Sequence, residues 1–148
     1  MDKNTYLVEL SESERTDFGR TAFRDQSPEQ RVFSAVYAAE GEINSGGFES
    51  YFSGWLGDTA NYASDALEAV GAPVMASIAR RALEIAGGPL PEDDDQRTTH
   101  VGELEDRQLD QLMELDDEFM EYPENLTNLL FAFVEAHPEA FGAVPASE

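Results

Sequence analysis

The chain carries the sequence EINSGGFESYFSGWLGD at residues 42–58, where a glycine turn leads directly into a cluster of aromatic residues. This stretch holds four of the eleven glycines and four of the fifteen Phe, Tyr and Trp residues of the protein. Gly46 and Gly47 can take the positive φ angles found at helix ends, so the helix before them is expected to end at Asn44. Aromatic residues then recur at helical spacing, at Phe48, Tyr51, Phe52 and Trp55. We therefore expect a short buried helix on which longer helices pack.

The segment before this stretch has a well-marked helix start. Ser27 is suited to the N-cap, Pro28 to the first helical position and Gln30 to the third, where it completes a capping box. Apolar residues follow at helical spacing, at Val32, Phe33, Val36, Tyr37 and Ile43. Further upstream, residues 1–10 show no clear helical period, and a second capping box predicts a helix over residues 12–25.

Two short helices are expected directly after the aromatic stretch. An alanine-rich pattern ends at Gly71, and Pro73 restarts a helix that Gly87 and Gly88 terminate. Because so few residues separate them, these two helices should be neighbours in space. Residues 88–102 are rich in proline, glycine and charge, and we expect them to form a mobile acidic loop.

The C-terminal third predicts two more helices. One covers residues 103–121, and the other follows Pro123 and ends near His137. The tail after Gly142 is expected to be frayed. Since no alternating pattern of useful length occurs, the expected fold is all-α, a compact single-domain bundle of about six or seven helices over residues 1–148.

The composition narrows the cellular setting. A chain of 148 residues can bury a hydrophobic core without disulfides, and it contains no cysteine. Its first residues lack the basic start and apolar run of a signal peptide, and no apolar stretch approaches the roughly 20 residues of a membrane span. We therefore expect a cytoplasmic protein without membrane association.

Net charge is the most unusual property of the chain. Its 31 acidic residues face 9 basic ones, which gives a formal charge of -22. Such a charge repels nucleic acids and anionic membranes and attracts basic surfaces, so direct nucleic-acid binding is not expected. The excess is uneven: residues 92–124 hold 14 acidic residues against Arg97 and Arg107, whereas residues 61–91 hold three against two arginines. This clustering favours a partner-binding surface over a general adaptation to salt.

The predicted helix at residues 103–121 concentrates these charges on one side. At about 100° per residue, seven carboxylates fall within roughly a third of its circumference. Their Cβ atoms are about 5–6 Å apart, close to the roughly 7 Å between neighbouring phosphates along a DNA strand. With the aspartates of the acidic loop, the predicted partner-binding residues are Glu103, Asp106, Asp110, Glu114, Asp117, Glu118, Glu121, Asp93, Asp94 and Asp95. Asp116 and Glu105 project on the apolar side, and Asp116 is expected to accept a hydrogen bond from the turn at Gly46 and Gly47 or from a neighbouring helix N-terminus.

Two motifs resemble a family known from bacteria and long catalogued as a domain of unknown function. They are N-x-G-G-F-x-x-Y-F at residues 44–52 and L-D-D-x-F-x-x-Y-P at residues 115–123, and the resemblance spans roughly residues 28–137. The best-known member of that family is a DNA mimic, an acidic helical protein whose carboxylates imitate DNA phosphates and occupy a basic DNA-binding protein such as a transcription repressor. The resemblance implies a scaffold role for the residues Asn44, Gly46, Gly47, Phe48, Phe52, Asp116, Tyr122 and Pro123. A role in mimicry extends only to the acidic residues of this chain's own stripe.

Residues suited to catalysis are scarce. The two histidines, His100 and His137, stand alone in the sequence, where helix capping or simple exposure accounts for them. The chain has no metalloprotease, nucleophile-elbow or phosphate-binding motif, and Asp93 to Asp95 lack the spacing of a calcium loop. No enzymatic activity, metal or cofactor is therefore predicted.

The predicted function is binding of a basic nucleic-acid-binding protein, such as a transcription factor, in competition with DNA. Two alternative functions are compatible with the same acidic composition. The protein could neutralise a basic toxin as an immunity protein, or it could carry a salt-adapted surface and act through an apolar groove near Trp55. A homodimer would lengthen the acidic surface.

Overall fold

The computed structural model describes residues 3–11 and 22–142 of the chain. In these ranges the protein is all-α, as predicted, and contains no β-strand. Its elements, in order, are α1 (Lys3–Ser11), η2 (Phe23–Asp25), α2 (Pro28–Ser53), η3 (Trp55–Thr59), α3 (Ala60–Ala69), α4 (Pro73–Ile85), α5 (Asp94–Gly102), α6 (Asp106–Met120), α7 (Leu126–Glu135) and α8 (Pro138–Phe141), where η denotes a short 3-10 helix. None of these helices is long and apolar enough to cross a membrane.

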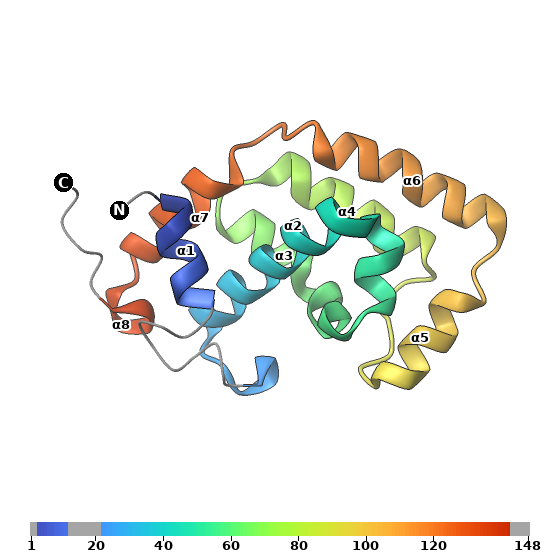
Figure 1. Cartoon of the computed structure of the whole chain (residues 1–148), viewed down its shortest axis with the longest axis horizontal. Coiled ribbons are helices and arrows are strands. Elements are labelled where there is room, and N and C mark those ends of the chain that lie inside the picture. The colour runs from blue at the N-terminus through green and yellow to red at the C-terminus, as the bar shows by residue number, and fades with distance from the viewer. Residues whose placement is uncertain (1–2, 12–21, 143–148) are drawn as a thin grey trace.

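α2 lies at the centre of the molecule and contacts α3, α5 and α6 (Figure 1). Its start is the predicted capping box. The Ser27 hydroxyl accepts from the backbone N–H of Gln30, and the Gln30 side chain accepts from the Ser27 N–H at 3.1 Å. Pro28 occupies the first helical position, where its missing N–H costs no hydrogen bond.

The sequence predicted that this helix ends at Asn44, which is wrong. The glycine turn bends α2 without ending it. Gly47 alone leaves the helical conformation, with φ 83° and ψ -178°, and the helix resumes directly after it and runs to Ser53. Gly46 does not share the positive φ of Gly47. A single non-helical residue therefore redirects the last six residues of α2, whose Phe48, Tyr51 and Phe52 lie in the core.

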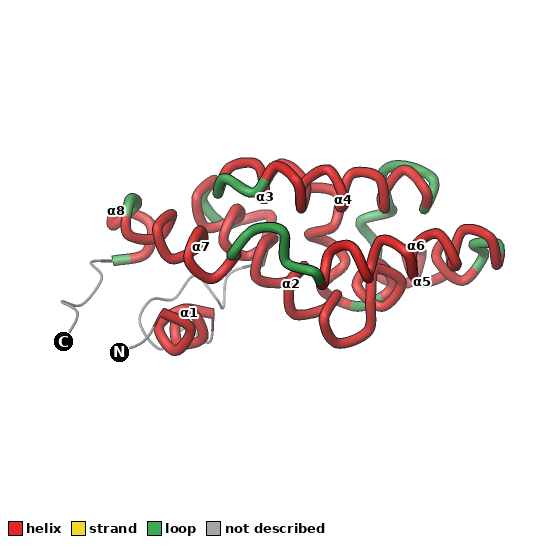
Figure 2. The backbone as a smooth tube through the Cα atoms, turned by 90° about the horizontal axis from the view of Figure 1, so that it is seen from above, coloured by secondary structure: helices red, strands yellow, loops and turns green. Residues whose placement is uncertain are grey.

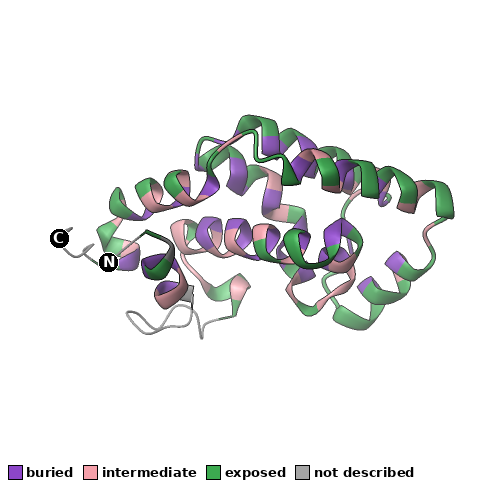
Figure 3. Cartoon of the chain, turned by 45° about the horizontal axis from the view of Figure 1, so that its top comes forward, coloured by how far each residue is buried: buried purple, intermediate pink, exposed green. Residues whose placement is uncertain are grey.

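The core is one cluster of buried side chains to which all eight helices contribute. Figure 3 shows the buried residues along the facing sides of the helices. Phe48, Tyr51 and Phe52 lie in this core, as predicted, with exposures of 2% or less. Trp55 is 76% exposed, so its predicted burial is wrong. The reason is local: Gly54 is extended, and Trp55 opens η3 in a new direction, so the helical spacing of the aromatic residues does not continue.

α3 and α4 pack against each other, as their tight connection predicted. Gly71 provides the positive φ of the connection, at 92°. The N-terminus of α4 is closed by a distant residue, because the Glu124 carboxylate accepts from the backbone N–H groups of Val74 and Met75 at 2.9 and 2.8 Å. This carboxylate follows the second sequence motif and replaces a local N-cap.

Four predictions about the ends and loops were wrong or fall largely outside the described residues. Residues 3–11 form α1, although no helical period was evident, and their burial comes from packing on α7. Half of the predicted acidic loop is the helix α5, which the buried side chain of Arg97 holds in place. The predicted helix at residues 12–25 lies mostly outside the described residues, and its last three residues form η2. The predicted frayed tail also lies outside them.

α6 lies along one side of the molecule, where it packs on α2 and α4 (Figure 1). α5 lies at one end, and α1, α7 and α8 lie at the other (Figures 1 and 2). The long outer side of α6 is thus turned away from the core.

Candidate partner-binding face

α6 is anchored firmly beneath its acidic side. Leu112, Leu115 and Phe119 are buried, and the Gln108 side chain donates to the Ile85 carbonyl at the end of α4 at 2.8 Å. The Gln108 oxygen accepts from the Glu105 N–H at 2.8 Å, which closes the first turn. Glu105 itself is exposed and precedes the helix, so its predicted position on the apolar side is wrong.

Five predicted carboxylates lie exposed on or directly after α6 and form what we call the acidic face: Asp106, Asp110, Glu114, Asp117 and Glu121. At 100° per residue they fall within roughly 80° of the helix circumference and extend for about 22 Å along its axis. No ion pair joins them to a basic side chain in the described part of the chain. Their charges are consequently available to a partner.

Glu103 and Glu118 do not belong to the continuous stripe that the sequence predicted. Glu103 is exposed but caps the C-terminus of α5, because the chain leaves the helix between α5 and α6. Glu118 is turned toward α4, where its carboxylate pairs with the Arg81 guanidinium at 3.0 Å. Packing of α6 against α4 thus decides which carboxylates stay unpaired.

Two methionines on the same side of α6 were missed by the sequence analysis. Met113 is 62% exposed and Met120 is 41% exposed. On the helix they lie within roughly 60° of Asp117, so they border the acidic face. The angle of 100° per residue is enough to place both methionines beside the acidic face. Their exposure, however, follows only from how α6 packs on its neighbours.

The predicted aspartate triplet begins α5 and serves it structurally. Asp93 caps the helix by accepting from the Gln96 N–H at 2.9 Å, and Asp94 pairs with Arg97 at 2.6 Å. Asp95 lies exposed in the first turn of α5, and its side chain neither caps the helix nor pairs with Arg97. The triplet therefore offers a partner less free charge than its sequence suggests.

Arg97 is fully buried, which the sequence analysis did not predict. Its guanidinium donates to the backbone carbonyls of Phe52, Gly54, Pro91 and Glu92 at 2.9–3.3 Å, and to Asp94. A Cβ on Gly57 would lie 2.5 Å from its Nε atom. One arginine thus joins the end of α2 to the chain before α5, and its spacing from Asp94 was the only signal in the sequence.

The two sequence motifs meet in the structure. The Phe48 N–H donates to Asp116 Oδ1 at 2.7 Å, which confirms the predicted hydrogen bond near the glycine turn. The Phe48 and Phe119 rings pack edge to face, with centroids 5.8 Å apart. Asn44 donates to the hydroxyl of Tyr122, a residue with φ 51°. The motif residues therefore hold α6 on the bend of α2.

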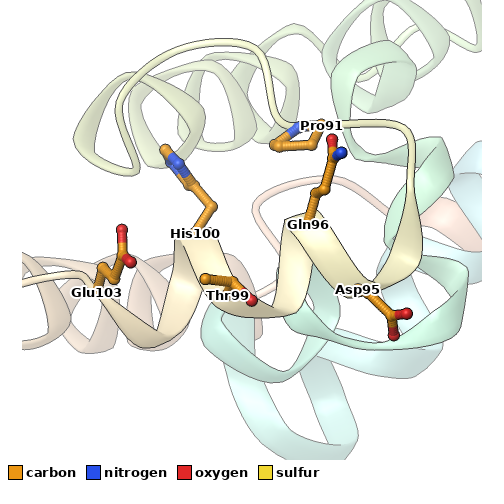
Figure 4. A pocket seen from close by; sticks show the side chains of 6 residues that line it. All are labelled: Pro91, Asp95, Gln96, Thr99, His100 and Glu103. Carbon is orange, nitrogen blue, oxygen red and sulfur yellow. The ribbon is translucent and has the colours of Figure 1, made fainter.

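A shallow surface pocket of about 390 Å³ lies beside α5. In Figure 4, Gln96 and His100 extend toward the side where Pro91 lies, whereas Asp95 extends in the opposite direction. The His100 Nε2 atom bonds the Ala86 carbonyl at 2.7 Å, so it donates there and caps the C-terminus of α4. Of the two roles that the sequence left open for this histidine, capping and simple exposure, the geometry supports capping.

Burial raises the pKa of three carboxyl groups at the edges of this scaffold. The pKa of Glu40 is raised by burial, against the opposing hydrogen bond from Tyr122. The pKa of Asp116 is raised by burial, against the bond from Phe48, and that of Asp58 is raised by burial despite the nearby Arg97 charge. Each of these three groups therefore binds a proton more readily in the folded protein than a carboxyl group with its ordinary pKa does.

Stability is expected to rise when the pH falls from 7 to about 5. A carboxyl whose folded pKa is raised binds more protons in the folded state than in the unfolded state, so folding becomes more favourable as the pH drops through that pKa. Lower pH also reduces the repulsion caused by the charge of -22. Thermal unfolding followed by circular dichroism at constant ionic strength measures this, and a melting temperature that falls steadily from pH 7 to 5 contradicts it.

A protein-family model described as DMP19-like protein matches residues 24–137 of the chain. The match includes both sequence motifs and all of α2 to α7. Searches of curated proteins and of solved structures found no match.

Proposed function

We propose that this chain, which belongs to the DMP19-like protein family, binds a basic nucleic-acid-binding protein through its acidic face, in competition with DNA. DMP19 is a family of DNA mimics. Membership of this family supports a function as a helical DNA mimic in general. The residues proposed to bind the partner are inferred from the exposed carboxylates of this chain itself.

The observation that carries the proposal is the row of unpaired carboxylates on the acidic face. Asp106, Asp110, Glu114, Asp117 and Glu121 are all exposed, and each lies three or four residues from the next. Steps of that length advance about 4.5–6 Å along the helix axis, which approaches the roughly 7 Å between phosphates on one DNA strand. The buried side of α6 holds them on a rigid support, which lowers the entropy lost on binding.

The exposed methionines favour a protein partner over a merely solvated surface. A surface adapted to salt gains nothing from exposing Met113 beside its carboxylates, whereas a flexible apolar side chain within a charged rim suits a protein interface. The partner proposed here therefore combines a basic surface with a small apolar contact.

The immunity-protein alternative uses the same electrostatics and differs in the partner's function. The groove alternative receives less support, because Trp55 is exposed at the start of η3 and does not line the buried aromatic cluster. Competition by DNA separates the first two, since a toxin need not use its DNA-binding surface.

The proposal is tested by capture of proteins from host lysate at low salt. The variant carries Asp106→Asn, Asp110→Asn, Glu114→Gln and Asp117→Asn. We expect the wild type to retain a basic DNA-binding protein that duplex DNA displaces, and the variant to bind that protein at least about tenfold more weakly. Binding by the wild type should also weaken as salt rises, because exposed charges are screened over about 8 Å at physiological ionic strength.

A matched control removes the same number of charges elsewhere. Asp25, Asp65, Glu84 and Glu135 are exposed on η2, α3, α4 and α7, and their neutralisation changes the net charge equally. We expect this control to bind the purified partner within about threefold of the wild type. Equal weakening by both variants would show that net charge alone attracts the partner. A captured protein that duplex DNA does not displace would favour the immunity alternative.

A further inference from the structure

The start of α2 and the segment around α8 bring together three side chains with metal-ligating atoms. Glu29 lies in the first turn of α2, His137 precedes α8, and Glu139 lies within α8. One possible ligand atom of each lies within 4.8 Å of those of the other two. Glu29 is more than 100 residues away from His137 and Glu139 in the sequence. None of the three belongs to the acidic face of α6.

His137 is oriented by contacts outside the cluster. Its Nδ1 atom bonds the Phe133 carbonyl at 2.7 Å, and a carbonyl only accepts, so Nδ1 carries the proton. In the neutral ring, Nε2 then holds the free lone pair. The imidazole also packs on the Phe133 ring, with centroids 4.3 Å apart. A hydrogen bond from one ring nitrogen to a backbone carbonyl is the arrangement that orients histidines toward metals in many proteins.

The helices that carry the three side chains are fixed to each other. The Gln30 side chain donates to the Ala140 carbonyl at 2.9 Å, directly beside Glu29 and Glu139 in sequence. Phe141 is buried and its ring packs on that of Phe33, with centroids 5.7 Å apart. The two helix starts therefore hold their relative position without a metal ion.

We propose that Glu29, His137 and Glu139 bind a divalent transition metal ion such as Zn²⁺. One imidazole nitrogen and two carboxylates form a donor set that zinc accepts, at ligand distances of about 2.0–2.2 Å. Tetrahedral ligands at that distance are about 3.4 Å apart, so the two glutamates rotate slightly to close the site. Magnesium and calcium prefer oxygen ligands alone, and the imidazole selects against them.

The whole protein is titrated with ZnCl₂, and the imidazole proton signals are followed by NMR. Because the chain has two histidines, His100 is an internal reference. We expect the His137 signal to change and saturate near one equivalent, while that of His100 stays in place. Isothermal titration calorimetry in the presence of excess Mg²⁺ should still detect the binding.

Variants separate a built site from general attraction to an acidic protein. Glu29→Gln and Glu139→Gln preserve side-chain size and should each weaken Zn²⁺ binding by about tenfold or more. Glu135→Gln removes an exposed carboxylate on α7 and should leave the affinity unchanged within about twofold. Equal effects of all three variants, parallel shifts of both histidines, or full displacement by Mg²⁺ would each overturn the proposal.

Discussion

Replacement of Arg97 by alanine is expected to lower the free energy of unfolding by about 3–5 kcal/mol. The side chain is fully buried, and its guanidinium satisfies four backbone carbonyls and one carboxylate. Truncation takes a donor from each of those carbonyls, of which only that of Gly54 is shown to keep another, the Gly57 N–H, and it opens a cavity between α2 and α5. Urea unfolding followed by circular dichroism measures the loss.

Arg97→Lys is not expected to restore the lost stability. A lysine presents one compact ammonium with three donors, which cannot reach the five acceptors that surround the planar guanidinium. Arg80→Ala is the matched control, because Arg80 is half exposed and pairs with the half-exposed Glu68. An exposed pair contributes about 0–1 kcal/mol. Equal losses of unfolding free energy in Arg97→Ala and Arg80→Ala would contradict the role of Arg97 as an anchor between α2 and α5.

Replacement of Gly47 by alanine is expected to cost about 2–4 kcal/mol. Its φ of 83° with ψ of -178° belongs to a region that is almost restricted to glycine. A Cβ at this position would also overlap the Asp116 carboxylate, whose Cγ would lie at 2.8 Å. The substitution therefore strains the backbone and displaces the group that accepts the hydrogen bond from Phe48.

Gly41→Ala is the matched control for Gly47→Ala, since Gly41 lies in the same helix and a Cβ there would meet no atom within 4 Å. This control should raise stability by about 0.5–1 kcal/mol, because alanine loses less entropy than glycine in a helix. Adding Asp116→Ala to Gly47→Ala should recover part of the stability by removing the overlap but not the strain. Equal stabilities of the two glycine variants would contradict the role assigned to Gly47.

Variants of the scaffold and variants of the acidic face are expected to change different measured quantities, stability in the first case and partner binding in the second. Arg97 and Gly47 act on folding, and their variants should change urea midpoints. The carboxylates of the acidic face contribute little to the fold, so their neutralisation should change binding more than stability. Like charges at three- or four-residue spacing even destabilise a helix by tenths of a kcal/mol per pair, which neutralisation relieves.

Patterns local in the sequence predicted much of this protein correctly. The capping box at Ser27, the apolar stripe of α6 and the tight connection at Gly71 each depend on residues within a few turns of one another. The hydrogen bond of Asp116 also followed from sequence, because a carboxylate on an apolar helix side needs a buried donor. The all-α fold class follows from such patterns alone.

Contacts between distant segments decided the rest. Arg97 converts a polar acidic segment into the helix α5, Glu124 closes the start of α4 from another element, and packing on α4 pairs Glu118 with Arg81. The meeting of Glu29 with His137 likewise depends on how helices are placed. Helical periodicity predicts which residues share one side of a helix. Which other element packs against that side depends on the three-dimensional arrangement of the chain. The sequence by itself therefore determined the helices and their excess of negative charge. Only the tertiary structure decided which charges remain free for a partner.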